Sequence, residues 1–211
     1  VIVEDAMYSI LTFFVLYLLM DERFNKQKYL IRRRILKLLG AAFDIYDMEG
    51  NVCFHVDQKA FKLKEDIRVY ADETKQEELL VIKARNIIDF SAVYDIVDSK
   101  TGQKVGALKR KGLKSMFKDE WQVLGLNDEV LGLIKEDNTL LATIRRFLVN
   151  LIPQEYKAYF GEKLVWHFKQ NFNPFVTKIL LDMSYDTENV MDNRVGIAAA
   201  VLLCAIEGKQ Q

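Results

Sequence analysis

The sequence predicts a mainly β protein in which successive antiparallel hairpins, twelve strands in all, surround a buried C-terminal helix. Two observations support this: a hairpin pattern that recurs along most of the chain, and a wholly apolar segment near its end. The pattern first appears in FDIYDMEGNVCFHV (43–56) and returns in YDIVDSKTGQKVGAL (94–108). Each stretch begins with an aromatic residue, Asp and Ile, and passes a second Asp and a glycine turn into an apolar run. Alternating apolar residues around a short polar turn are typical of β-hairpins.

Composition limits the classes of protein to consider. The 211 residues suffice for one core, and half of them are hydrophobic. The 30 basic and 30 acidic side chains cancel, so net charge gives no support for a nucleic-acid partner. Cys53 and Cys204 lie in apolar runs, which favours buried, reduced thiols. We therefore expect a cytoplasmic protein, either free or associated with a membrane surface.

The N-terminal part divides from the rest. Residues 6–20 form an uncharged run of fifteen residues, shorter than a membrane-spanning helix needs, and a basic stretch follows. Three interpretations stay open: a helix docked on the domain or a partner, a short membrane anchor, or sequence upstream of a natural start at Met20. We assign residues 1–27 to this lead-in and residues 28–211 to the barrel domain.

The hairpin units follow in order. They begin at Phe43, Ile67, Tyr94, Trp121 and Tyr156, and the first four starts are 24, 27 and 27 residues apart. Adding YLIRRRILKL (29–38) before them and VTKILLDMS (176–184) after them gives twelve strands. A β-propeller is disfavoured because each blade needs four strands, whereas a closed antiparallel barrel or a sandwich fits. In the first hairpin we expect Phe43 and Ile45 to face the core, and Asp44 and Asp47 to face water or shape the turn.

Two helices interrupt or end this pattern. Residues 138–152 place apolar side chains at helical spacing before Pro153, which predicts an amphipathic helix covering the barrel. Residues 195–207 are apolar on every side, with Asp192 or Asn193 as the N-cap. The apolar core of this second helix is too short to span a bilayer, so we expect the strands to wrap around it.

Three segments carry a family resemblance: residues 29–56, 94–124 and the terminal MDNRVGIAAAVLLCAI (191–206). Together with the strands between them, they resemble the LURP-one-related family, which belongs with the Tubby C-terminal-like superfamily and the phospholipid scramblases. The resemblance covers residues 28–206 and is weakest over residues 140–156. It implies a closed twelve-stranded barrel enclosing the final helix. Because tubby-like domains are associated with phosphoinositides, it also suggests lipid headgroups as ligands.

Catalytic and metal-binding motifs do not emerge. His55 and His167 lie in expected strands, and no phosphate loop, nucleophile elbow or zinc-binding spacing is present. The acidic segment 182–193 offers a weak calcium candidate in Asp182, Asp186 and Glu188. However, Thr187 and Asn193 occupy positions where an EF-hand needs Gly and Glu. We expect no enzyme activity, no cofactor and no metal.

Two basic clusters are the candidate ligand contacts. Arg32 and Arg34 come from the first, and Lys109, Arg110, Lys111 and Lys114 from the second. Such groups could bind phosphate-rich headgroups through charge-assisted hydrogen bonds, or they could be solvated strand ends.

The leading hypothesis is therefore a non-enzymatic barrel that binds anionic phospholipid headgroups at a membrane surface. The alternative is a cytoplasmic protein–protein interaction scaffold, with residues 6–20 docking on a partner or a second copy. Scramblase activity is less favoured, and no nucleic-acid partner is expected.

Overall fold

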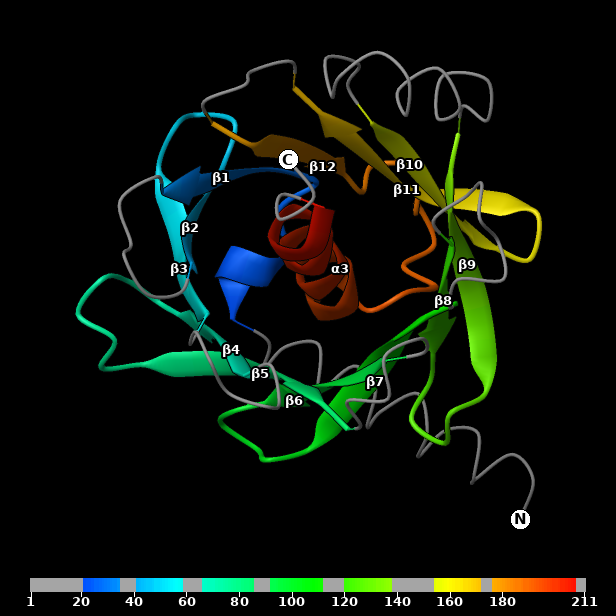
Figure 1. The fold of residues 1–211 in the computed structure, drawn as a ribbon, viewed down its shortest axis with the longest axis horizontal. Helices are drawn as coiled ribbons and strands as arrows, with labels where there is room; N and C mark the ends of the chain where they lie inside the picture. The colour runs from blue at the N-terminus through cyan, green and yellow to red at the C-terminus, as the bar shows by residue number, and fades with distance from the viewer. Residues whose placement is uncertain are drawn as a thin grey trace.

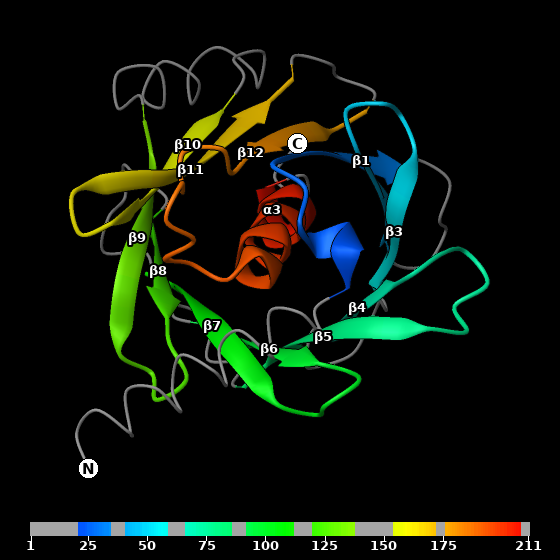
Figure 2. The same ribbon diagram turned by 180° about the vertical axis from the view of Figure 1, so that it is seen from behind.

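A computed structural model describes residues 21–34, 41–58, 66–85, 92–111, 120–137, 154–171 and 176–207. Within them, twelve antiparallel strands close into a barrel around one helix, which confirms the predicted fold (Figures 1 and 2). The helices expected at residues 6–20 and 138–152 lie outside the described residues. The strands are β1 (Lys28–Arg34), β2 (Ala41–Tyr46), β3 (Val52–Gln58), β4 (Asp66–Tyr70), β5 (Glu78–Ala84), β6 (Val93–Asp98), β7 (Lys104–Arg110), β8 (Glu120–Leu124), β9 (Val130–Glu136), β10 (Glu155–Phe160), β11 (Lys163–Gln170) and β12 (Lys178–Asp182).

The strands follow one another around the barrel in chain order, and β1 closes the ring by pairing with both β2 and β12. This up-and-down order gives the barrel two different ends. The tight turns of the five hairpins, from β2–β3 to β10–β11, gather at the end that we call the hairpin end. The connections between hairpins gather at the other end, where β1, β3, β5, β7, β9 and β11 finish, and we call it the connection end.

The recurrence in the sequence corresponds to equivalent positions in the barrel. The first residues of the five units all face the interior and are at most 6% exposed: Phe43, Ile67, Tyr94, Trp121 and Tyr156. Each hairpin also has a register shift shortly before its turn, as between Ile45 and Tyr46 in β2. Because such bulges bend and twist a strand, their repetition helps the sheet to curve into a closed barrel.

The helix α3 (Asn193–Glu207) runs along the inside of the barrel (Figure 1). Twelve strands enclose a space wider than wall side chains alone fill, and α3 occupies it. Asp192 caps its first turn, since its carboxylate accepts a hydrogen bond from the Arg194 amide at 2.9 Å, as one of the two proposed N-caps requires. Cys53 and Cys204 are both buried and unpaired with each other. No helix in the described part of the chain is long and apolar enough to cross a membrane.

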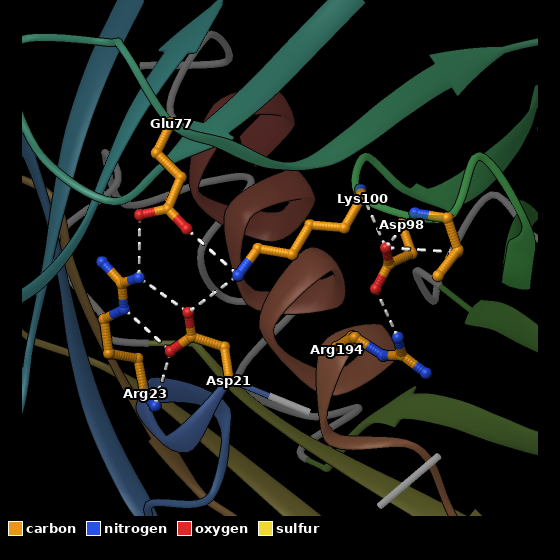
Figure 3. Close-up of polar contacts among 7 residues, drawn as sticks. Asp21, Arg23, Glu77, Asp98, Lys100 and Arg194 are labelled. Carbon is orange, nitrogen blue, oxygen red and sulfur yellow. Dashed lines mark hydrogen bonds and ion pairs between the residues drawn. The ribbon is translucent and has the colours of Figure 1, made fainter. Parts of the chain in front are cut away.

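A short 3-10 helix, η1 (Glu22–Phe24), covers part of the hairpin end. Phe24 stacks on Phe54 inside the barrel, with ring centroids 4.7 Å apart. Around it, Arg23 bonds to Asp21 at 2.6 Å and to Glu77 at 3.2 Å, and Lys100 reaches Glu77 at 3.1 Å (Figure 3). These ion pairs tie η1 to the turns of two hairpins.

The two aspartates of the first hairpin differ from each other. Asp47 shapes the turn as expected, because its carboxylate accepts the amides of Glu49 and Asn51. The expectation for Asp44 was wrong: it lies on the outer face of β2 but is only 4% exposed and bonds to neighbouring strands. Phe43 and Ile45 are fully buried in the core, as predicted.

Candidate anion-binding surface

The three consecutive arginines at the end of β1 divide between the two faces of the barrel wall. Arg33 is the cross-strand partner of the fully buried Phe43, so it lies on the inner face. Arg32 and Arg34 therefore lie on the outer face, because successive side chains of a strand alternate. Arg33 also lies near enough to the end of α3 to oppose the burial that raises the pKa of Cys204 to about 12.

Arg34 belongs to a cluster of bonded side chains on the outer wall. Its guanidinium donates to Asp44 Oδ2 at 2.6 Å and to Glu73 Oε1 at 2.6 Å. The other Asp44 oxygen lies 3.0 Å from His55 Nδ1. Burial raises the pKa of Asp44, but the hydrogen bonds from Arg34 and His55 outweigh it and the net shift is downward. Asp44 is therefore an ionised, fully engaged carboxylate.

Arg32 lies directly opposite a second cation. In the register between β1 and β12 its Cα partner is Lys178, and both side chains point outward from the seam that closes the barrel. Asp44 is the Cα partner of Arg32 on β2, yet its oxygens bond to Arg34 and His55 instead. Neither Arg32 nor Lys178 has a side-chain hydrogen bond or ion pair with any residue that the structure describes. Two like charges therefore face each other across a strand pair, and the nearest cross-strand carboxylate, Asp44, bonds to other residues.

The surroundings of this pair add a donor and an apolar strip. Asn171, which follows β11, accepts the Lys178 amide at its Oδ1 atom. Its carboxamide N–H groups have no acceptor in the described part of the protein. The next outward pair toward the hairpin end is Leu30 with Leu180, both half-buried, so apolar surface adjoins the cations.

The second basic cluster lies on the opposite wall, since β7 is six strands from β1 in the twelve-stranded ring. Both clusters finish at the connection end. Arg110 turns inward, where its guanidinium lies 5.9 Å from the Trp121 ring centroid. Lys109 and Lys111 face outward, and Lys111 pairs with Glu120 at 2.5 Å. Lys114 lies outside the described residues.

The weak calcium candidates each bond to donors of the protein. Asp182 pairs with Lys28 at 2.8 Å, and Glu188 pairs with Lys163 at 2.9 Å. Asp186 is buried and accepts the amides of Val190 and Met191. Within the described ranges, no three His, Cys, Asp or Glu side chains come together as metal ligands.

Cys53 and His55, two positions apart on β3, do not form a nucleophile–base contact. Cys53 Sγ lies 3.9 Å from the Asn51 carbonyl oxygen, whereas His55 bonds to Asp44. Burial is the largest cause of the raised pKa of the Cys53 thiol, which disfavours its thiolate form.

Sequence reasoning identified Arg32 but missed Lys178. The two residues are 146 positions apart, and only the closure of the barrel makes them neighbours. The available signal was weak: Lys178 lies near the start of the last expected strand (176–184), as Arg32 lies near the end of the first expected strand.

The comparisons with known proteins bear on the family. A search among curated proteins found no match. The model of the LURP-one-related family matches residues 55–199, more than half of the chain, and we conclude that this chain belongs to the LURP-one-related family.

Proposed function

We propose that this barrel is a non-enzymatic module that associates with anionic phospholipid surfaces through basic residues at its connection end. The observation that supports the proposal most is the convergence of both basic clusters on that end, although they come from distant parts of the sequence. The outward cations of the two clusters are Arg32, Arg34, Lys109 and Lys111, and Lys178 adds another beside Arg32. Of these, Arg32, Lys178 and Lys109 have no ion-pair partner in the described part. Exposed cations near an anionic leaflet each contribute about 1 kcal/mol of attraction.

A flotation experiment with the full chain tests the proposal. We expect the protein to float with phosphatidylcholine vesicles that contain an anionic lipid, and to stay behind with phosphatidylcholine alone. The association should weaken as salt is raised, because surface charges are screened over about 10 Å at 0.1 M salt. Equal flotation with neutral and anionic vesicles, or none with either, would count against the proposal.

The hairpin end supplies the matched controls. The exposed large hydrophobic side chains of the described residues lie at that end: Met48, Val52, Leu126, Val130, Phe160 and Tyr185. A Leu126→Ser, Phe160→Ser variant should float like the wild type if charge at the connection end drives association. Lys163→Gln removes a cation from the hairpin end and should likewise have little effect. Loss of flotation in the first variant alone would point to apolar insertion and contradict the proposal.

A further inference from the structure

We propose that Arg32, Lys178 and the adjoining Asn171 form a binding subsite for a phosphomonoester group on the β1–β12 seam. Arg32 and Lys178 are Cα partners, point outward, and have no side-chain acceptor in the described residues. Directly opposed like charges destabilise a strand pair. Because no described carboxylate bonds to either cation, an external anion can bind between them.

The charge of the pair selects the ligand class. A phosphomonoester carries close to two negative charges near neutral pH, whereas a carboxylate or a phosphodiester carries one. Two opposed cations are therefore matched by one phosphomonoester. Arg32 can donate two parallel hydrogen bonds to phosphate oxygens, and Lys178 acts as a compact point charge. The carboxamide N–H groups of Asn171, which have no acceptor among the described residues, provide a further hydrogen-bond donor beside Lys178.

The surroundings of the subsite bear on its charge and on the source of the phosphate group. Asp44, the remaining cross-strand neighbour of Arg32, has both oxygens bonded to Arg34 and His55. Leu30 and Leu180 extend the same outward face with half-buried apolar surface. A phosphomonoester lipid such as phosphatidic acid can pair its phosphate with the cations and pack its apolar part against the leucines. Inorganic phosphate can pair with the cations alone. The choice of a lipid as the ligand rests on the proposed function, whereas the binding of a phosphomonoester group does not.

The test compares two double variants on the two walls. Arg32→Gln with Lys178→Gln removes the subsite, and Lys109→Gln with Lys111→Gln removes the same charge from the opposite wall. We expect the first to weaken binding to phosphatidylcholine vesicles containing phosphatidic acid by about tenfold or more, as loss of charged hydrogen bonds implies. The second should weaken it less, because it removes general charge attraction to the membrane but leaves the subsite intact. The first variant should melt no lower than the wild type, since it also removes a repulsion.

Further arms separate this inference from the proposed function. Inorganic phosphate should shift the amide NMR signals of Arg32 and Lys178 in the wild type, and vesicles with phosphatidylserine at equal surface charge should bind less tightly than those with phosphatidic acid. Equal losses from the two double variants, with vesicle binding intact in the wild type, would overturn the subsite and leave the proposed function standing. Phosphate shifts at Arg32 and Lys178 without any vesicle binding would support the subsite and overturn the membrane proposal.

Discussion

Gly106 on β7 is a position where the barrel wall closely approaches the central helix. A Cβ atom at this position would lie 2.9 Å from a methyl group of Val195 and 3.1 Å from the Leu124 carbonyl oxygen. On the helix side, a Cβ at Gly196 would lie 2.9 Å from the Met183 sulfur. The first turn of α3 therefore packs closely against β7 on one side and Met183 on another, and both contacts depend on a glycine. A larger residue at either position must displace the helix or the wall.

Replacing Gly106 by Ala should lower the free energy of unfolding by about 1–3 kcal/mol, the usual cost of overpacking a core. Because the closest atom belongs to the Val195 side chain, Val195→Ala should recover part of this loss in the double variant. Urea denaturation of the four proteins in this cycle measures the coupling. Strict additivity of the two substitutions would show that the close contact does not determine the cost.

At the scale of elements, η1 depends on ion pairs rather than on its own length. Three residues cannot form a stable helix alone, so Phe24 is held by its stacking on Phe54 and by the network of Asp21, Arg23 and Glu77. The side-chain hydrogen bond from Arg23 is the largest cause that lowers the pKa of Asp21 to about 2. Protonation of Asp21 should therefore release this end of the barrel.

Acidification should reduce stability through Asp21 in a defined window. Its folded pKa of about 2 lies below the ordinary value of 3.8, so its contribution is complete above pH 4 and is lost as the pH falls toward 2. Unfolding free energies measured between pH 5 and pH 2 should fall less steeply in Asp21→Asn than in the wild type. Asp72→Asn is the control for hydrogen exchange at η1, since Asp72 bonds to Thr74 within its own turn. If the protection factors of the η1 amides stay the same between pH 5 and pH 2 in the wild type, the role of Asp21 is contradicted.

At the scale of the whole molecule, nearly all strand pairs are local, and one is not. Eleven of the twelve strand pairings in the ring join strands that are consecutive in the sequence, and the twelfth joins β1 to β12 across most of the chain. The helix α3 follows β12 and lies inside the closed ring (Figure 2). Exposure of α3 to water therefore requires the barrel to open.

The thiol of Cys204 reports this opening. It is 0% exposed, and burial raises its pKa to about 12, so both access and thiolate formation are suppressed. In a Cys53→Ala background, Cys204 should react with a thiol reagent about 10³-fold or more slowly than an exposed thiol, as expected for protection by global unfolding. An added thiol at Thr101, an exposed turn residue, provides the rapid reference. Fast labelling of Cys204 while tryptophan fluorescence remains native would contradict an enclosed helix.

Much of this architecture could be predicted because its determinants are local. Alternation in the hairpins, the residues that start each unit, and the apolar character of 195–207 all depend on neighbouring residues, and the structure confirms them. Asp44 was misplaced because its burial depends on Arg34 and His55 from adjacent strands. Alternation along and just beyond β7 predicts that Arg110 and Lys111 face opposite sides. Which of them faces inward depends on the pairing of Arg110 with Trp121 and of Lys111 with Glu120.

The sequence by itself determined the hairpin repeat, the number of strands and the burial of the last helix, since period-two alternation and uniform apolarity fix which faces avoid water. Only the tertiary structure decided which charges meet. Closure of the barrel brings Lys178 beside Arg32 and leaves Asp44 to Arg34, because strand register, a property of pairs of distant segments, selects cross-strand neighbours. The candidate anion site is a consequence of that register.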